Sequence, residues 1–212
     1  DDLLVQIPYV HRALAALGIP VLTVPGVEAD DVLGSLARRL AEAGHEVTLV
    51  TGDKDFCQLV GPRIRLLDTM RDKVTGPEDV AARFGVEPDR VVDVLALTGD
   101  PVDNIPGVPG IGPKTAAKLL EEYGSLEAVV AHAAQIKGKR GEALREHGQR
   151  ALGNRPLVTI DTQVPLDVGP QGLRPGPQDR AGLAVLLREL EFHRFLRDLG
   201  LEGEPAPGQG AA

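Results

Sequence analysis

The chain has 212 residues, which is enough for one large domain or two small ones. Its hydrophobic fraction of 42% and charged fraction of 25% are ordinary for globular proteins, and no apolar run approaches the roughly 18 residues of a membrane span. The single cysteine, Cys57, excludes an intrachain disulfide and a cysteine-based zinc site. No secretory signal pattern is present. These features predict a globular, cytoplasmic, monomeric protein that does not enter a membrane.

The formal net charge of −8 is unfavourable for a nucleic-acid binder, because such proteins usually meet phosphates with lysine and arginine. The charges are unevenly distributed, however. Seven acidic residues fall in three short clusters, where two divalent cations would change the net charge from −8 to −4. Gly107–Lys118 has two lysines and no acid, and Lys137–Arg150 has five basic residues against two glutamates. Both segments are candidates for phosphate binding, although a solvated helix face explains the second equally well.

The N-terminal part alternates helical and extended patterns. Residues 3–17 have apolar side chains at helical spacing, followed by a glycine and a proline that end the helix. The apolar run 21–24 predicts a strand, residues 29–43 a second helix, and residues 47–51 a second strand. Strand, helix and strand within about 30 residues form a βαβ unit, so we expect these two strands to be parallel and buried.

From residue 76 onward the alternation gives way to helical patterns separated by glycine and proline. Helices are expected at 77–84, 88–97, 113–123, 126–133 and 183–199. The stretch 153–182 is rich in glycine and proline and should meander, and 203–212 has the composition of a linker or disordered tail. We therefore predict an α/β region at residues 1–75, a helical region at 76–202, and then the tail.

Two acidic clusters follow the two predicted strands. Glu28, Asp30 and Asp31 lie where the first strand gives way to a helix, and Asp53 and Asp55 directly follow the second strand. Acidic residues at a helix start also act as caps, so the first cluster alone favours a structural role. Together, the clusters should meet at the carboxyl edge of parallel strands, where α/β proteins bind ligands. Their mutual repulsion then indicates bound cations.

A third acidic pair, Asp100 and Asp103, lies at the end of a predicted helix and the start of a turn rich in proline and glycine. Turn formation alone explains this pair about as well as ligand binding does. The three clusters offer only oxygen ligands, and no HExxH motif or cysteine and histidine set is present. Such ligands favour Mg²⁺ or Mn²⁺ over zinc.

The segment from residue 107 to 118 (GVPGIGPKTAAK) predicts a turn that grips phosphate. Glycines let backbone N–H groups approach a phosphate, and a helix that starts near residue 113 adds the positive end of its dipole. The predicted contact residues are Gly107, Gly110, Gly112, Lys114, Thr115 and Lys118. The GxxxxGK[ST] spacing of a P-loop is absent, and a plain connection between two helices is the alternative.

Aromatic residues make up only 3% of the chain and tryptophan is absent, which argues against a base-stacking surface for single strands. Contacts to nucleic acid are therefore expected to be with the backbone. An acidic metal cluster combined with a grip on duplex phosphates suits metal-assisted hydrolysis of a phosphodiester bond.

Three blocks, VPGVEADDVLGSLARRL, VTGDKDFCQLV and LALTGDPVDNIPGVPGIGPKTAAKLL, occur in this order. Together they resemble the 5′ nuclease domain of bacterial DNA polymerase I and the wider flap endonuclease family, from about residue 3 to about residue 201. The resemblance implies a PIN-like parallel sheet flanked by helices, followed by a helical region with a helix-hairpin-helix-type element that holds duplex DNA. It also implies a metal-dependent 5′-3′ exonuclease or flap endonuclease that acts at 5′ flaps and nicks in DNA replication and repair.

The resemblance also assigns roles to individual residues. It implies that two divalent ions are held, the first by Glu28, Asp30 and Asp31 and the second by Asp53, Asp55, Asp100 and, directly or as an outer carboxylate, Asp103. In relatives the carbonyls of the glycine-rich turn often hold a K⁺ ion. The nuclease domain can also be joined to a C-terminal polymerase domain.

The family's first strand, with one metal-binding aspartate, and its helical arch should precede Asp1, and neither has a counterpart in this sequence. We therefore expect weak or no nuclease activity from these 212 residues alone. Two other interpretations stay open, namely a non-catalytic module that binds duplex DNA by its structure, and a metal-dependent phosphatase or ribonuclease. The glycine-rich turn argues against the phosphatase, since a small phosphoester requires no grip on a duplex.

Overall fold

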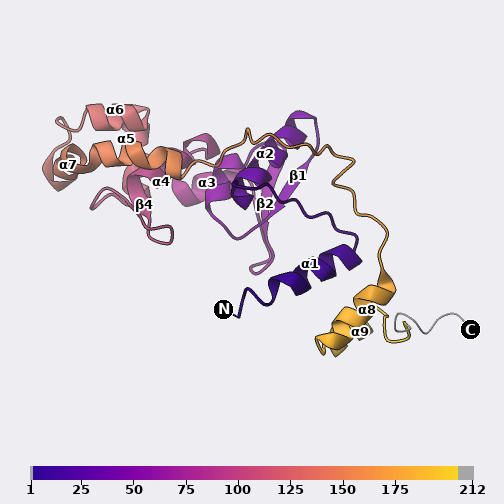
Figure 1. Cartoon of the computed structure of the whole chain (residues 1–212). Helices are drawn as coiled ribbons and strands as arrows, with labels where there is room; N and C mark the ends of the chain where they lie inside the picture. Colours follow the sequence, from indigo (N-terminus) through magenta and orange to yellow (C-terminus); the bar gives the residue numbers. More distant parts are fainter. Residues whose placement is uncertain (1, 205–212) are drawn as a thin grey trace, which may run out of the picture. The chain divides into compact units, whose positions relative to one another are not determined.

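The structure, a computed structural model, describes residues 2–204 (Figure 1). The chain forms two compact units, of which the larger contains residues 26–166 and the smaller contains the described parts of 1–25 and 167–212. The division predicted between residues 75 and 76 stays a prediction. Among residues 2–204, none of the helices combines the length and the apolar character that crossing a bilayer requires.

A three-stranded mixed sheet forms part of the larger unit. Its strands are β1 (Val47–Val50), β2 (Ile64–Asp68) and β3 (Lys73–Thr75), in the order β1-β2-β3. β1 and β2 are parallel, with Val47 opposite Ile64, whereas β3 returns antiparallel to β2. In β2 the side chains of Ile64 and Leu66 are buried and Arg65 is exposed, as expected for a strand with one covered face. The strand predicted at 47–51 is confirmed, and the β2–β3 hairpin is an addition to the prediction.

The strand predicted at 21–24 is wrong, and so is the βαβ unit built on it. These residues join neither of the two sheets in the described chain. A strand requires backbone hydrogen bonds to a neighbour, and Pro20 and Pro25, which flank the run, have no N–H to donate. β1 instead finds its parallel partner in β2, and the connection between them includes the 3-10 helix η1 (Asp55–Leu59).

The helix predicted at 29–43 is confirmed as α2 (Ala29–Glu42). Asp30 and Asp31 lie in its first turn, where carboxylates meet the positive end of the helix dipole. Gly44, with a φ of 91°, follows its end and takes a left-handed conformation that glycine adopts readily. α2 therefore starts with an acidic pair whose position is fixed by the helix itself.

From residue 77 to residue 157 the larger unit is mainly helical, as predicted, with one small hairpin. The helices and 3-10 turns are α3 (Pro77–Phe84), η2 (Pro88–Arg90), α4 (Val91–Thr98), α5 (Pro113–Tyr123), α6 (Leu126–Ala131), α7 (Gly138–Asn154) and η3 (Arg155–Leu157). Between α4 and α5, the short strands β4 (Gly99–Asp100) and β5 (Ile105–Pro106) pair antiparallel around the turn 101–104. Asn104 in that turn has a φ of 57°, which asparagine tolerates better than most residues.

One hydrophobic core joins the sheet to these helices. Its fully buried members include Phe56 of η1, Leu97 of α4, Leu126 of α6 and Leu144 of α7. Burying a side chain of this size completely stabilises the fold by about 1.5–3 kcal/mol. The core therefore holds the loops that follow β1 and α4 in fixed positions relative to each other.

The smaller unit contains α1 (Ile7–Ala16), α8 (Arg180–Glu189) and α9 (His193–Asp198). α1 lies within the helix predicted at 3–17. The single helix predicted at 183–199 is wrong in its middle, because the chain breaks it into α8 and α9 at residues 190–192. Glu191 there has a φ of 57°, a left-handed conformation through which a right-handed helix cannot continue.

The stretch predicted to meander at 153–182 does so between residues 158 and 179, since α7 extends to Asn154 and α8 begins at Arg180. Most of the predicted tail, residues 205–212, lies outside the described residues. Its first part is held in place, because Glu204 Oε1 accepts a hydrogen bond from Arg180 Nε at 3.0 Å.

Candidate metal centre and nucleic-acid interface

The three acidic clusters converge on one pocket of the larger unit. The pocket has a volume of about 360 Å³. Its acidic lining comes from the start of α2, from the loop and η1 after β1, and from the turn between β4 and β5, and consists of Glu28, Asp30, Asp31, Asp53, Asp55 and Asp103. Three segments that are far apart in the sequence thus place carboxylates in one cavity.

Asp100, the seventh predicted acid, is buried in β4 and is not part of the pocket surface. It nevertheless belongs to the same cluster, because one carboxylate oxygen each of Asp55, Asp100 and Asp103 lies within 4.8 Å of the other two. Carboxylates this close repel one another when all are ionised, and a cation between them removes the repulsion. The geometry of this trio is compatible with a bound metal ion.

Local hydrogen bonds shape the acidic loops. After β1, the N–H of Asp53 donates to Thr51 Oγ1 at 3.0 Å, and the N–H of Asp55 donates to Asp53 Oδ1 at 2.9 Å. After β4, the N–H of Val102 donates to Asp100 Oδ1 at 2.9 Å. Each turn thus uses one carboxylate oxygen of an aspartate as its own acceptor. Asp53 also lines the pocket, so its turn is part of the pocket wall.

Burial and mutual repulsion raise the pKa of two of these carboxyl groups. For Asp30, burial is the main cause, followed by the negative charge of Asp53. For Asp55, burial again comes first, and the charge of Asp53 adds to it while neighbouring Lys54 opposes it. In addition, Asp55 Oδ1 is buried and has no hydrogen-bond partner. The raised pKa values show that neighbouring groups offset the cost of burial and repulsion only in part, although Lys54 Nζ lies 3.4 Å from Asp55 Oδ1.

Lys54 supplies a positive charge among these acids, a role that sequence reasoning missed. Its Nζ donates a hydrogen bond to Oδ2 of buried Asp100 and lies 3.4 Å from Asp55 Oδ1. The hydrogen bond from Lys54 is the main reason why the pKa of Asp100 is lowered. The available signal was the lysine between two acids in the run Asp53-Lys54-Asp55, since its side chain has to lie near at least one acidic group.

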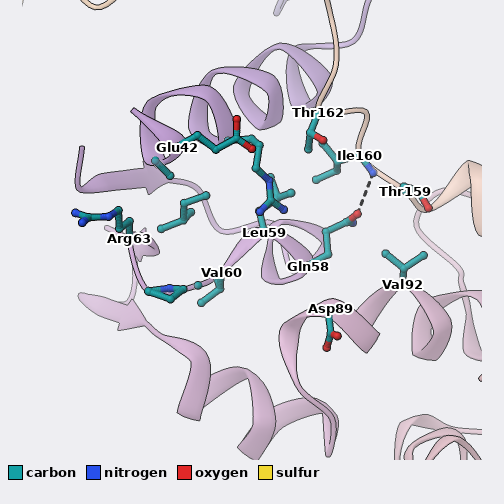
Figure 2. Close-up of a pocket in the computed structure, with 15 residues that line it drawn as sticks. Glu42, Gln58, Leu59, Val60, Arg63, Asp89, Val92, Thr159, Ile160 and Thr162 are labelled. Atoms are coloured by element: carbon teal, nitrogen blue, oxygen red, sulfur yellow. Dashed lines mark hydrogen bonds between the residues drawn. The ribbon is translucent and has the colours of Figure 1, made fainter. Parts of the chain in front are cut away.

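Residues 157–160 complete the wall of the acidic pocket, although they follow η1 by about 100 residues. The link between the two segments is Gln58, whose Oε1 accepts a hydrogen bond from the N–H of Ile160 at 3.0 Å (Figure 2). A second cavity, of about 640 Å³, shares Thr159 and Ile160 with the acidic pocket and is lined largely by α2, η1 and the residues before β2. None of the predicted site residues lines this larger cavity.

The glycine-rich hairpin, residues 107–112, connects β5 with α5 and is anchored by its apolar side chains. Val108 and Ile111 are buried, and the N–H of Val108 donates to the carbonyl oxygen of Leu97 at 2.8 Å. Arg150 Nη2 of α7 donates to the carbonyl oxygen of Gly107 at 2.7 Å. The hairpin is therefore fixed to the helical core on its inner side.

The predicted contact residues of this hairpin differ in what surrounds them. A Cβ at Gly107 would lie 2.0 Å from the carbonyl oxygen of Thr98, so this glycine is required for backbone packing. A Cβ at Gly110 or Gly112 would meet no atom within 4 Å, so both glycines border open space. α5 adds two exposed ammonium groups and one half-buried hydroxyl, those of Lys114, Lys118 and Thr115.

The second basic segment forms most of α7. Two of its arginines are used internally, since Arg145 Nη1 donates to the carbonyl oxygen of Ala133 at 3.1 Å and Arg150 contacts the hairpin. All five basic residues are exposed, and the other three are Lys137, Lys139 and Arg140. Phosphate binding and a solvated face both remain compatible with this arrangement.

Two family models match successive parts of the chain. Residues 1–85 match the 5′-3′ exonuclease, N-terminal resolvase-like domain, and residues 86–181 match the 5′-3′ exonuclease, C-terminal SAM fold. The two matches follow each other without a gap and together span most of the chain.

Relatives with similar sequences are bacterial DNA polymerases. DNA polymerase I of Pseudomonas aeruginosa is 46% identical over 220 residues, and the thermostable DNA polymerase I of Thermus filiformis is 41% identical over 212 residues. Each match covers 100% of this chain but only 24% and 25% of the respective relative. The chain thus spans about a quarter of the length of these curated relatives.

Solved structures with a similar fold include a 5′-exonuclease and a DNA-bound catalytic core. A structure of T5 5′-exonuclease with bound divalent metal ions (zinc) has a TM-score of 0.62 at 25% identity and covers 68% of this chain and 54% of that one. The catalytic core of Rad2 in complex with DNA substrate has a TM-score of 0.62 at 18% identity and covers 92% of this chain and 70% of that one. Together with the family models, these likenesses confirm the predicted fold class, a PIN-like α/β region followed by a helical one.

Proposed function

The chain belongs to the 5′-3′ exonuclease family, and we propose that it provides the acidic site and the DNA grip of a structure-specific 5′ nuclease. This enzyme hydrolyses phosphodiester bonds at 5′ flaps and nicks during DNA replication and repair, including primer removal. The observation that supports the proposal most strongly is the convergence of three separate acidic loops on one pocket. One of these loops, the turn 101–104, leads through β5 directly into the glycine-rich hairpin.

The pocket suits two hard divalent cations, Mg²⁺ or Mn²⁺. Its ligand atoms are carboxylate oxygens. Among residues 2–204, the buried Oδ1 of Asp55 has no hydrogen-bond partner and only an ion pair with Lys54 at 3.4 Å, so a cation could still bind it. The residues that would hold the ions are Glu28, Asp30, Asp31, Asp53, Asp55, Asp100 and Asp103. Divalent cations bound there would lower the pKa of the attacking water and would offset the negative charge that develops on the leaving oxygen.

The chain's own residues position the carboxylates of the pocket and offset part of their negative charge. α2 fixes the first acidic cluster, and the turn around Asp53 fixes the second. Lys54 keeps the charge of buried Asp100 compensated, so the fold can assemble before any cation is bound. We therefore expect phosphodiester hydrolysis to take place in the pocket where the three acidic loops meet.

The hairpin and α5 form the proposed grip on duplex DNA. The backbone N–H groups of Gly110 and Gly112 themselves can approach a phosphate, because open space borders both residues. Their neighbours Pro109 and Pro113 have no N–H, and the N–H of Ile111 donates to the carbonyl oxygen of Val108 at 3.1 Å. Exposed Lys114 and Lys118 add positive charge near the start of α5, where the helix dipole also favours an anion. Such contacts are independent of base sequence, as binding to a flap or nick requires. A K⁺ ion at the carbonyls of the turn is part of the proposal.

The proposal is tested with a labelled 5′-flap substrate and Mg²⁺, using the full-length protein that contains this chain. Asp53→Asn and Asp55→Asn should each lower single-turnover cleavage by about 1,000-fold, equivalent to about 4 kcal/mol in the activation barrier. Binding of the flap substrate in Ca²⁺ or EDTA should change by less than about 3-fold, because the grip lies on other residues.

Asp89→Asn is the matched control, since Asp89 is exposed and lies outside the acidic pocket. Its cleavage rate should equal that of the parent protein. Substantial turnover in Asp53→Asn would reject the metal assignment. Flap binding without cleavage in the parent protein would instead support a non-catalytic binding module.

Two broader proposals concern the whole protein. Since the relatives are bacterial DNA polymerase I proteins of about four times this length, we propose that a polymerase region accompanies this chain and that the protein acts in the cytoplasm. Primer-extension activity of the full-length protein, and its fractionation with DNA-bound cytoplasmic proteins, test these two points.

A further inference from the structure

An extended segment, residues 158–166, lies against α2 and η1, the two elements that contain Asp30, Asp31 and Asp55, and we name it the strap. It belongs to neither sheet, yet its burial alternates, with Val158 and Ile160 buried and Thr159 and Asp161 exposed. A segment without ladder partners has to satisfy its backbone polar groups in another way. In the strap, side chains of α2 and η1 provide this.

α2 holds the strap through a row of polar side chains. Asp31 Oδ1 accepts a hydrogen bond from the N–H of Asp161 at 2.8 Å. One turn later, Ser35 Oγ donates to the carbonyl oxygen of Asp161 at 3.1 Å and accepts from the N–H of Val164 at 2.9 Å. Residues four apart lie on the same face of a helix, so the row runs along the strap. Asp31 is thus bonded to the strap and also lines the acidic pocket.

The row continues to the end of the strap, and the packing beneath it is close. Arg39 Nη1, one turn beyond Ser35, donates to the carbonyl oxygen of Leu166 at 2.8 Å. A Cβ at Gly34 would lie 2.5 Å from Ile160 Cγ2, so only glycine allows the strap to approach α2 this closely. A shift of the strap would therefore be transmitted to α2, and with it to the first acidic cluster.

Gln58 of η1 holds the beginning of the strap. Its side chain is 9% exposed and satisfies three backbone groups at once. Nε2 donates to the carbonyl oxygens of Asp55 and Val158, at 2.9 and 3.0 Å, and Oε1 accepts from the N–H of Ile160 at 3.0 Å (Figure 2). One amide group thus connects an acidic residue of the pocket to the strap.

We propose that Gln58 is a positioning residue for the acidic pocket and acts through the strap. Gln58 ties Asp55 to the strap, and the strap ties Asp31 to the same frame, so two acids from separate elements keep their separation. Repulsion between the clusters would otherwise push α2 and η1 apart. This inference rests on the proposed function, since it gives Gln58 a role toward cations in that same pocket.

Calorimetric titration of the full-length protein with MnCl₂ tests the role of Gln58. Gln58→Met keeps the length and bulk of the side chain but removes all three hydrogen bonds. The Kd for Mn²⁺ should rise by about 10-fold, which corresponds to about 1.4 kcal/mol. Flap cleavage at saturating Mn²⁺ should stay within about 3-fold of the parent rate, because every carboxylate is still present.

Two further variants separate positioning from general stability. Ser35→Ala removes the strap contact on α2 and should raise the Mn²⁺ Kd by about 3-fold, a smaller change because fewer hydrogen bonds are lost. Ser125→Ala is the control, since Ser125 Oγ caps α6 by accepting from the N–H of Ala128 and touches neither pocket nor strap. It should lower the Tm and leave the Kd unchanged.

The outcomes are distinguishable. An unchanged Kd in both Gln58→Met and Ser35→Ala, with Tm lowered as in Ser125→Ala, would overturn the inference and leave Gln58 a structural residue. A parent protein that neither binds Mn²⁺ nor cleaves a flap would overturn the proposed function as well. Should Gln58→Met fail to fold, the milder Ser35→Ala decides the question by the same titration.

Discussion

The acidic pocket and the glycine-rich hairpin are connected through the turn 101–104 and β5 but are held in place differently. The hairpin depends mostly on nearby residues, because Val108 and Ile111 enter the core beside α4 and α5, with one further contact from Arg150, 43 positions from Gly107. The pocket depends on distant ones, since Gln58 bonds to a residue 102 positions away and Asp31 to one 130 positions away. Apolar burial favours the hairpin, whereas charge repulsion opposes the pocket. The pocket therefore forms only when the whole larger unit is folded. The hairpin requires only the helices that it contacts.

The largest effect is expected at the packed side of the hairpin. Gly107→Ala should lower the free energy of unfolding by about 3 kcal/mol, because the new Cβ would lie 2.0 Å from the carbonyl oxygen of Thr98. Gly110→Ala should lose only about 1 kcal/mol, since its Cβ meets open space and only its φ of 76° is unfavourable. Urea unfolding followed by circular dichroism measures both values. Equal losses would show that this close contact does not anchor the hairpin.

A smaller effect is expected in the pocket, and it should depend on cations. Lys54→Met should lower the free energy of unfolding by about 2 kcal/mol in EDTA, because buried Asp100 loses its partner while the site stays partly solvated. Excess Mg²⁺ should restore most of the loss. Lys73→Met is the control, because Lys73 Nζ forms an exposed ion pair with Asp79 Oδ1 at 4.0 Å. It should change the free energy of unfolding by less than about 0.5 kcal/mol. A loss that Mg²⁺ leaves unaltered would contradict the idea that Lys54 compensates the acids.

The smallest effect is expected at the exposed side of the hairpin. Lys114→Ala should leave stability unchanged and weaken binding to nicked duplex DNA by about 3- to 10-fold, with the salt-dependence slope reduced by about one. Fluorescence anisotropy at several salt concentrations measures this. Lys139→Ala in α7 is the matching variant. An equal loss of DNA affinity in Lys139→Ala would favour phosphate binding by α7, and an unchanged affinity would favour a solvated helix face.

Elements with strong local signals could be predicted from the sequence. α2 and α5 were found because apolar spacing, helix-start acids or proline, and a following glycine all agree. The strand predicted at 21–24 is wrong because an apolar run indicates only a tendency to be buried and not a pairing partner, and in the structure none of these four residues is buried. The β2–β3 hairpin was missed because three-residue β3 has too little pattern of its own. The break at Glu191 was missed because the helical spacing continues through it.

The residues of the candidate site also fall into those that local sequence signals predict and those that only the tertiary fold brings together. The seven acids were visible as clusters in motifs, but their roles as ligands stay predictions. Lys54 and Gln58 were missed because what they contact is set by the tertiary fold, with Asp100 46 positions from Lys54 and the strap about 100 from Gln58. One signal was present, namely the alternation of apolar and polar residues in the run VTIDTQV, residues 158–164, which is typical of an extended segment against a surface.

The row formed by Asp31, Ser35 and Arg39 restricts how α2 can change in length. Adding one residue between Asp31 and Ser35 would rotate the following part of the helix by about 100° relative to the start. Ser35 and Arg39 would then point away from the strap while Asp31 stayed in place. Length variation in this protein should therefore be found in the loops before residue 28 or after residue 43, where the helix phase is unaffected.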